Sequence, residues 1–405
     1  MLPLLLPIVL AACTGSGTGK LWIVDNKPGA VADFTDVQAA VDAAQDGDTI
    51  RVRASPIFYA APTISAKSLA IGGVSGHGVT VDWLGETRVL QLSPGQSVAL
   101  DAIRLHGHWS TTAPGSRTRA LAVSGCAGAV WLSRCGVYGG TSQEGAYVSA
   151  SHAVVFDRSL VQGGSGESGY PPTSQYGGPG AVALRLEGSR ASVLGSELIG
   201  GSGGQDGYFS GYQPPCDGGS GEGGAWALAN SELFVLGSFA KNGQPKWFGT
   251  VAAVLFADAT SIVRTTEVTV TTVQGCQSFV AYSGPHEDWG LAYRQLLPPP
   301  LVLESPSATL FASGQPGDVV VLLAAAGTDA LALPGVHGLL QLSAPLFVVG
   351  AKLLPASPPA AHPFTFPIAA PTLPGQYASL CFQAAFVAAG GAALLSNPAL
   401  VKVPL

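Results

Sequence analysis

A repeated unit constrains this chain more than any other feature of its sequence. Each copy holds a short alternating apolar stretch, a turn of small residues, a second apolar stretch, and a third stretch that ends at glycine. Alternating apolar residues are typical of β-strands. Three strands per copy, repeated in tandem, predict a parallel β-solenoid whose coils stack about 4.8 Å apart. The copies span residues 90–107, 121–140, 147–164, 182–201, 226–243 and 254–275, with a weaker copy at 68–86.

One position of the repeat is held by a small side chain in every copy. Stacked coils place equivalent residues directly above one another, so a tight corner favours small residues at that position. We interpret the column as a structural ladder and not as a row of nucleophiles, because no base accompanies each hydroxyl. The aligned residues are Ala102, Cys135, Ser159, Ser196, Ser238 and Thr266.

The loop after the terminal glycines lengthens from one copy to the next, over residues 141–145, 165–181 and 202–224. Insertions at one repeat position emerge on one side of a solenoid, so we expect the recognition surface there. Tyrosine and phenylalanine in these loops offer flat faces to sugar rings or to a protein partner. The alternative is that the rings anchor the loops to the solenoid. The candidate ligand-binding residues are Tyr170, Tyr176, Asp206, Tyr208, Phe209, Tyr212, Asp217 and Glu222.

Residues 34–52, FTDVQAAVDAAQDGDTIRV, predict a short helix that closes the open N-terminal end of the solenoid. Thr35 or Asp36 begins it, and Val37, Ala40 and Val41 follow at helical spacing. This segment, followed by ISAKSLAIGGVSGHGVTVD, resembles the opening of the pectin-lyase-like superfamily of bacterial right-handed parallel β-helix proteins. The resemblance covers residues 22–290, with SPIFY at 55–59 where the superfamily has a P-G-x-Y turn. It implies the fold and leaves activity open between lyases, hydrolases and non-enzymatic surface proteins.

The composition of the sequence changes at residue 293. Residues 293–306 form a proline-rich linker, and residues 307–405 show short strands separated by turns. The predicted fold class is therefore all-β: a right-handed parallel β-helix over residues 22–292, then a small antiparallel β-sandwich over 307–405.

Residues 1–13, MLPLLLPIVLAAC, are expected to be a signal peptide. Its end, LAAC, resembles the lipobox of bacterial lipoproteins, in which the cysteine, here Cys13, is lipidated. Residues 14–21 would then be a tether, and the protein would be exported to the outer membrane or cell surface. The alternative is an ordinary secretory signal.

Composition limits the partners and the chemistry. Only 11% of the residues are charged and the net charge is −6 without a basic run, which disfavours nucleic acid. No catalytic residue and no metal site are expected. Calcium is the alternative, because GGSGGQDGY at 200–208 is similar to a calcium-binding nonapeptide, although Asp206 falls one place late. His106 and His108 form a close pair without a visible third ligand, and Arg134 and Arg158 are interpreted as solvated turn residues, without carboxylates as neighbours.

These observations predict an exported, surface-anchored, monomeric and non-catalytic β-helix protein that binds glycan or protein through its long loops. The alternative is a polysaccharide lyase or glycoside hydrolase. Such an enzyme needs ionisable groups gathered on one face, whereas Glu167, Asp206, Asp217 and Glu222 are scattered singly among glycines.

Overall fold

The computed structural model describes most of the chain from residue 19 onward. The described ranges are 19–74, 80–108, 118–168, 177–204, 221–244, 253–271, 280–290, 294–297, 307–325, 328–333, 336–337, 339–342, 346–355, 361–367, 376–388 and 390–404. The predicted signal peptide, its Cys13 and most of the tether lie outside these residues.

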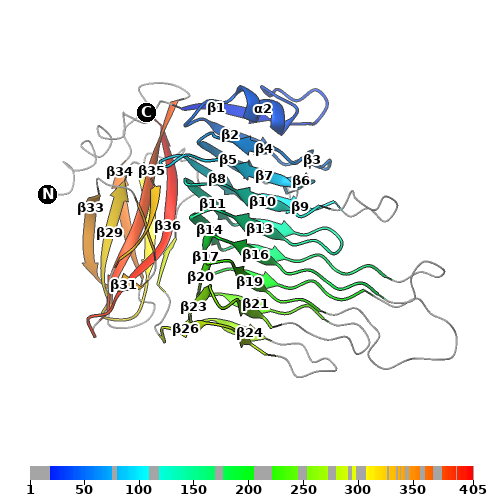
Figure 1. The fold of residues 1–405 in the computed structure, drawn as a ribbon. Coiled ribbons are helices and arrows are strands. Elements are labelled where there is room, and N and C mark those ends of the chain that lie inside the picture. The colour runs from blue at the N-terminus through cyan, green and yellow to red at the C-terminus, as the bar shows by residue number, and fades with distance from the viewer. Residues whose placement is uncertain are drawn as a thin grey trace, which may run out of the picture.

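The predicted β-helix is confirmed, with three strands per coil and three stacked parallel sheets (Figure 1). Sheet 1 contains β1 (Gly19–Val24), β2 (Thr49–Arg53), β5 (Leu69–Val74), β8 (Ser97–Asp101), β11 (Ala129–Ser133), β14 (Ala153–Asp157), β17 (Arg190–Leu194), β20 (Glu232–Leu236), β23 (Ile262–Thr266) and β26 (His286–Asp288). Sheet 2 contains β3 (Tyr59–Ala60), β6 (Asp82–Leu84), β9 (Arg104–His106), β12 (Gly136–Tyr138), β15 (Leu160–Gln162), β18 (Glu197–Ile199), β21 (Phe239–Lys241) and β24 (Thr269–Thr271). Sheet 3 contains β4 (Thr63–Ser65), β7 (Thr87–Leu90), β10 (Leu121–Ser124), β13 (Ala146–Ser149), β16 (Leu184–Glu187), β19 (Ala225–Leu228), β22 (Leu255–Ala257) and β25 (Tyr282–Ser283).

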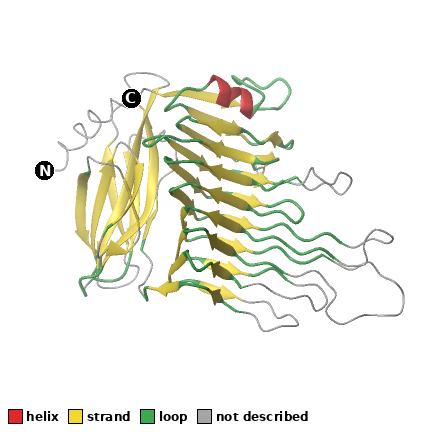
Figure 2. Cartoon of the chain, viewed as in Figure 1, coloured by secondary structure: helices red, strands yellow, loops and turns green. Residues whose placement is uncertain are grey.

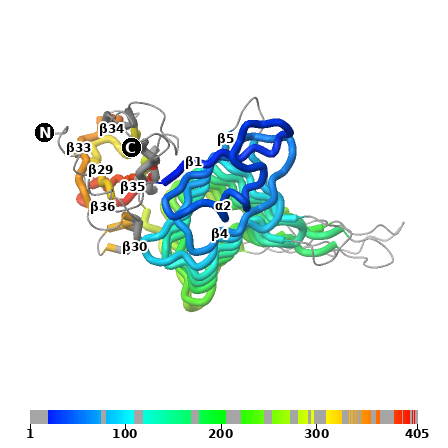
Figure 3. Tube along the Cα trace, turned by 90° about the horizontal axis from the view of Figure 1, so that it is seen from above, coloured from blue at the N-terminus to red at the C-terminus, as the bar shows by residue number. Residues whose placement is uncertain are grey.

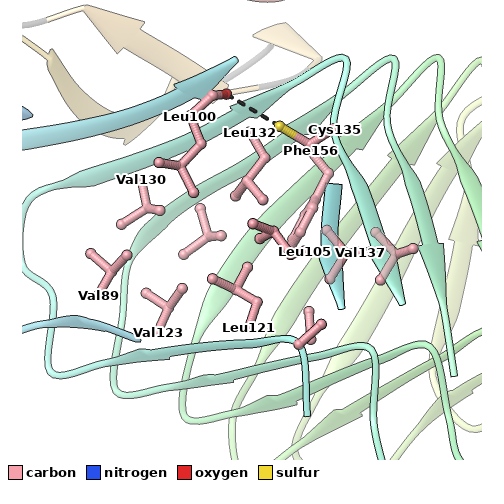
Figure 4. Packing of buried hydrophobic residues seen from close by; sticks show 14 of the residues in the cluster. Val89, Leu100, Leu105, Leu121, Val123, Val130, Leu132, Cys135, Val137 and Phe156 are labelled. Carbon is pink, nitrogen blue, oxygen red and sulfur yellow. Dashed lines mark hydrogen bonds between the residues drawn. The ribbon is translucent and has the colours of Figure 1, made fainter. Parts of the chain in front are cut away.

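The interior of the helix is filled by the inward side chains of all three sheets. Leu132 and Phe156 from sheet 1, Val137 from sheet 2 and Leu121 and Val123 from sheet 3 meet there (Figure 4). All five are fully buried. The alternating apolar stretches of the repeat are therefore the core, and their polar neighbours point outward.

The corner between sheets 1 and 2 contains the predicted ladder of small residues. The backbone N–H of Cys135 donates to Ser159 Oγ (3.0 Å), that of Ser159 to Ser196 Oγ (3.0 Å), and that of Ser196 to Ser238 Oγ (3.1 Å). Each of these four side chains is buried. The hydroxyls thus satisfy backbone groups from coil to coil, which confirms a structural role.

Two residues of the predicted column were placed wrongly. Thr266 pairs with Leu236, so Val268 takes the position that follows Ser238 in the column. Ala102 lies one residue early, because Asp101 pairs with Ser133. Branched apolar side chains fill the column at both ends of the ladder, so a search for small residues shifts the alignment there.

A second ladder occupies the corner between sheets 3 and 1. Backbone N–H groups donate in turn from Cys126 to Ser151 Oγ, from Ser151 to Ser189, from Ser189 to Ser231 and from Ser231 to Ser261, over 2.9–3.2 Å. Cys126 and Cys135 are free buried thiols, so they do not pair with each other. Burial raises the pKa of Cys135 to about 12, which keeps this thiol protonated and unreactive.

The N-terminal end is closed by helix α2 (Val37–Ala43), as predicted. Asp36 is the N-cap and accepts a hydrogen bond from the Ala39 N–H (3.0 Å). Lys67 Nζ lies 2.9–3.0 Å from three backbone carbonyls at the other end of the helix and caps it. Among the residues that the structure describes, no helix is long and apolar enough to cross a membrane.

The C-terminal part is a sandwich of antiparallel strands (Figure 2). One layer contains β27 (Gln295–Leu297), β28 (Ser307–Ser313) and β34 (Ala361–Pro367). The other contains β29 (Val319–Ala325), β33 (Phe347–Leu353), β35 (Gln376–Val387) and β36 (Ala393–Pro404), with β31 (Val336–His337) at its edge. A hairpin of β30 (Thr328–Ala332) and β32 (Leu339–Leu342) completes it. Strand β27 lies inside the range predicted as linker, and β1 begins inside the range predicted as tether.

The sandwich packs on the outer face of sheet 1. Buried apolar residues from both sides meet there, among them Trp131 and Val155 of the helix and Leu342 and Leu395 of the sandwich. Strand β35 also pairs with β1 in an antiparallel register. The sandwich therefore covers much of the outer face of sheet 1, and it leaves the outer faces of sheets 2 and 3 open for recognition (Figure 3).

Candidate functional site

Glycine-rich segments leave the corner between sheets 2 and 3, on the side away from the C-terminal sandwich (Figure 1 and Figure 3). We name their described residues, 139–145, 163–168, 177–181, 200–204, 221–224 and 243–244, the glycine wing. Each segment donates a backbone hydrogen bond to the one before it, over 2.7–3.1 Å. The donor and acceptor pairs are Gly164 to Gln143, Ala181 to Gly164, Gly201 to Ala181, Glu222 to Gly201 and Gly243 to Glu222. The predicted one-sided loops are thus layered at their base.

Close contact between these backbones explains the glycines. A Cβ atom built on Gly164 would lie 1.6 Å from the carbonyl oxygen of Gly140, and one on Gly204 would lie 1.7 Å from that of Glu167. A Cβ on Gly243 would lie 1.8 Å from Gly201 O. Real Cβ atoms do not approach this closely, so the GGSG segments at 163–166 and 200–203 serve backbone packing.

Most of the predicted ligand-binding residues fall beyond the part of the chain that the structure describes. Glu222 lies in the glycine wing, half-buried, with its backbone N–H on Gly201 O (3.1 Å). Within the described ranges, no group of three His, Cys, Asp or Glu side chains is placed to hold a metal ion. The remaining candidates stay predictions: Tyr170, Tyr176, Asp206, Tyr208, Phe209, Tyr212 and Asp217.

A groove of about 360 Å³ lies where the glycine wing meets the outer face of sheet 2. Its floor is formed by His106, Tyr138 and Gln162, which follow one another in a single row across β9, β12 and β15. Its wall is the backbone of residues 163–166. We call this site the wing groove.

A glycine lets the Tyr138 ring pack closely on its own strand at the floor of the wing groove. A Cβ on Gly136 would lie 2.6 Å from Tyr138 Cε2, so the tyrosine ring lies over the backbone of its own strand. The His106 ring stacks on Tyr138, with 5.0 Å between ring centroids and 15° between planes. Phe58 meets His106 edge-on at 5.5 Å. His106 and Tyr138 come from successive coils and Phe58 from two coils before His106, and the three rings form one apolar cluster.

Polar groups at the floor fall into two sets. His106 Nε2 lies 2.8 Å from Asp82 Oδ1, and Thr80 donates to the other oxygen of Asp82 (2.5 Å), so this carboxylate fixes the imidazole. This contact occupies the Nε2 atom of His106. By contrast, the Tyr138 hydroxyl and the Gln162 amide form no hydrogen bond with any residue that the structure describes. They are free to bind a polar ligand.

The opposite flank of the wing, where it joins sheet 3, contains a row of charged residues that the sequence did not reveal. We name it the ion-pair row: Glu86, Arg88, Arg119, Glu144, Tyr147, Arg185 and Glu187. Arg88 Nε lies 2.8 Å from Glu86, and Arg185 Nε lies 2.9 Å from Glu187. Three of these residues precede strands of sheet 3 and the other four lie within them, but loops of unequal length obscure their alignment in the sequence.

One carboxyl group of the ion-pair row, that of Glu187, is held in its ionised form. The Tyr147 hydroxyl donates to Glu187 Oε2 at 2.6 Å. This hydrogen bond raises the pKa of Tyr147 and lowers the pKa of Glu187. A carboxyl group with a lowered pKa is ionised at neutral pH and holds no proton to donate.

Arg134 and Arg158 lie at turns, as predicted, and Arg134 is exposed, but the prediction that they lack carboxylate neighbours is wrong. Arg134 Nε donates to Asp101 (2.9 Å) and Arg158 Nε to Asp157 (2.9 Å). Burial raises the pKa of Asp157 above its usual value. Asp101 was missed because it comes from the preceding coil, whereas Asp157 directly precedes Arg158 in the sequence and was overlooked. Both arginines lie at the corner between sheets 1 and 2, away from the glycine wing.

Known proteins resemble this chain in fold. No protein-family model matches it, and a search of curated proteins finds no match. A rhamnogalacturonan lyase is 13% identical over 67% of this chain and 88% of its own, with a TM-score of 0.32. The pectin methylesterase of Aspergillus niger is 12% identical over 68% and 87%, with a TM-score of 0.24. Tailspike protein 2 of Escherichia coli O157:H7 bacteriophage CAB120 is 9% identical over 98% and 66%, with a TM-score of 0.32.

These identities and TM-scores say nothing about activity in this chain. The resemblance to right-handed parallel β-helix proteins of the pectin-lyase-like type, first indicated by residues 34–52, agrees with the three stacked parallel sheets. It concerns the architecture alone.

Proposed function

We propose that the protein is an exported, non-catalytic glycan-binding β-helix protein and that the wing groove holds a sugar ring. One observation carries the proposal: the Tyr138 ring packs over Gly136 and against the His106 ring in a groove whose tyrosine hydroxyl and Gln162 amide have no hydrogen-bond partner among the described residues. A sugar ring offers an apolar face to such rings and hydroxyls to the groups around them. A volume of about 360 Å³ suits one or two rings.

Binding without cleavage is supported by the state of the nearby ionisable groups. Asp82, which contacts His106 of the groove floor, is engaged by His106 and Thr80. A glycoside hydrolase needs one carboxyl group that keeps its proton near neutral pH. A reducing-sugar and unsaturated-product assay on any glycan that binds separates this proposal from the lyase or hydrolase alternative, because turnover would contradict it.

Surface attachment through lipidated Cys13 is part of the same proposal. Strand β1 begins at Gly19, so residues 14–18 would connect the lipid to the folded protein. An extended residue spans at most about 3.5 Å, which limits that connection to roughly 20 Å. The capped end of the β-helix would then lie close to the membrane, with the glycine wing pointing along the surface.

Replacing Tyr138 by alanine is expected to weaken binding of the recognised glycan about tenfold, because the aromatic ring at the floor of the wing groove is lost. A glycan-array screen finds the ligand, and isothermal titration of wild type and Tyr138→Ala measures the change. Gly136→Ala should reproduce much of the loss with Tyr138 still present, since the new Cβ lifts the ring.

The matched control is Trp226→Ala, which removes a half-buried aromatic side chain from the outer face of sheet 3. It should leave glycan affinity unchanged. Equal losses for Tyr138→Ala and Trp226→Ala, or no loss for either, would exclude the wing groove as the binding site.

A further inference from the structure

One guanidinium of the ion-pair row, that of Arg119, has only part of its hydrogen-bonding capacity engaged. Arg119 Nε lies 3.3 Å from Glu86 Oε1 and 3.9 Å from Glu144 Oε2. The guanidinium carbon lies 4.4 Å from the centre of the Tyr147 ring, which holds the group by stacking. The two terminal nitrogens of Arg119 form no hydrogen bond with any residue in the described ranges. A stacked guanidinium with both terminal N–H groups free is arranged to bind an oxyanion in a bidentate manner.

Glu144 occupies the space between two guanidiniums without bonding tightly to either. Its carboxylate lies 3.9 Å from Arg119 Nε and 3.6 Å from Arg185 Nη1. Charged N–H···O bonds are shorter, at about 2.7–2.9 Å. Arg185 does form such a bond with Glu187, at 2.9 Å. Glu144 is therefore the one carboxylate of the row that an incoming anion can displace at small cost.

We propose that Arg119 and Arg185 form a binding site for an oxyanion group, a carboxylate or a sulfate ester, and that Glu144 competes for the same place. This site is separate from the wing groove, because it lies on the other flank of the glycine wing, at sheet 3. Glu86 lies on the Nε side of Arg119, and the Arg119 side chain is partly exposed. The competing carboxylate makes binding weak and sensitive to salt.

Two substitutions of opposite sign test the site. Glu144→Gln removes the negative charge and keeps the shape of the side chain. It should tighten anion binding about fivefold, because the residue that competes with the anion is then neutral. Arg119→Gln should weaken it about tenfold, because the bidentate donor is lost. Binding is measured by NMR titration of the full chain at low ionic strength, with methyl glucuronide, glucose 6-sulfate and methyl glucoside as probes. The first two probes distinguish carboxylate from sulfate, and the third, which has no charge, should not bind at this site.

Controls separate this site from general charge effects and from the proposed groove. Arg190→Gln removes another guanidinium of the helix, paired with Glu232 at 2.7 Å, and should leave the titration unchanged. Arg119→Lys keeps the charge and should lose most of the binding, with thermal denaturation confirming the fold. Tyr138→Ala should have no effect on anion binding. Failure of Glu144→Gln to tighten binding, or an equal loss in Arg190→Gln and Arg119→Gln, would overturn the proposal while leaving the wing groove untouched.

Discussion

Replacing Gly164 by alanine should lower the free energy of unfolding by about 3 kcal/mol, although it adds a single methyl group. The new Cβ would lie 1.6 Å from the backbone carbonyl oxygen of Gly140, and that carbonyl belongs to a layered segment that cannot move alone. Gly164 also accepts from the Ala181 N–H (2.9 Å) and donates to Gln143 O (2.9 Å), so a shift breaks hydrogen bonds on both sides. Chemical denaturation measures the loss.

Gly390→Ala is the matched control for this substitution. No heavy atom lies within 4 Å of a Cβ at Gly390, and its backbone conformation suits any residue. Its stability should equal or slightly exceed that of the wild type. Hydrogen exchange should show lost protection at residues 163–168 and 177–181 in Gly164→Ala alone. Equal stabilities of the two variants would mean that the wing is not a tightly packed bundle of backbones.

The same substitution links the glycine wing to recognition. Gly164 lies in the wall of the wing groove, so displacement of the wall changes the shape above Tyr138. We therefore expect Gly164→Ala to lose glycan binding together with local protection, whereas Tyr138→Ala loses binding and keeps protection.

The β-helix was predictable because its signal is local and repeated in every coil. Alternating apolar residues define the strands, and the buried Oγ ladder through Ser159, Ser196 and Ser238 requires small side chains in one register. The prediction failed at Thr266, where the ladder gives way to Val268 and the sequence no longer constrains the alignment.

The site was less predictable because its parts come from different coils. The position of the Tyr138 ring depends on the missing Cβ of Gly136 and on the His106 ring from the preceding coil. Likewise, Glu144 meets Arg119 and Arg185 only after loops of unequal length have closed. The direction of the long loops could be predicted from their common repeat position, whereas these contacts could not.

The second large effect concerns the C-terminal sandwich. Asp318 and Arg294 are both buried, and Arg294 Nε lies 2.8 Å from Asp318 Oδ2. The pair joins the start of β27 in one layer to the start of β29 in the other. Asp318→Ala should destabilise the sandwich by about 3–5 kcal/mol, because it leaves a guanidinium buried without its carboxylate. Hydrogen exchange over residues 307–404 measures the loss separately from the helix.

Comparison with an exposed ion pair shows why burial sets the size of this effect. Arg264 Nε lies 3.0 Å from Glu287, whose side chain is half exposed, and Arg264 keeps Glu232 as a second partner. Glu287→Ala should therefore cost less than about 1 kcal/mol. Arg294→Met combined with Asp318→Ala should recover part of the stability lost in Asp318→Ala, since the buried charge is removed together with its carboxylate. If the double variant is no more stable than Asp318→Ala, the loss comes from packing of the Arg294 side chain and the turn that Asp318 closes, and not from the buried charge.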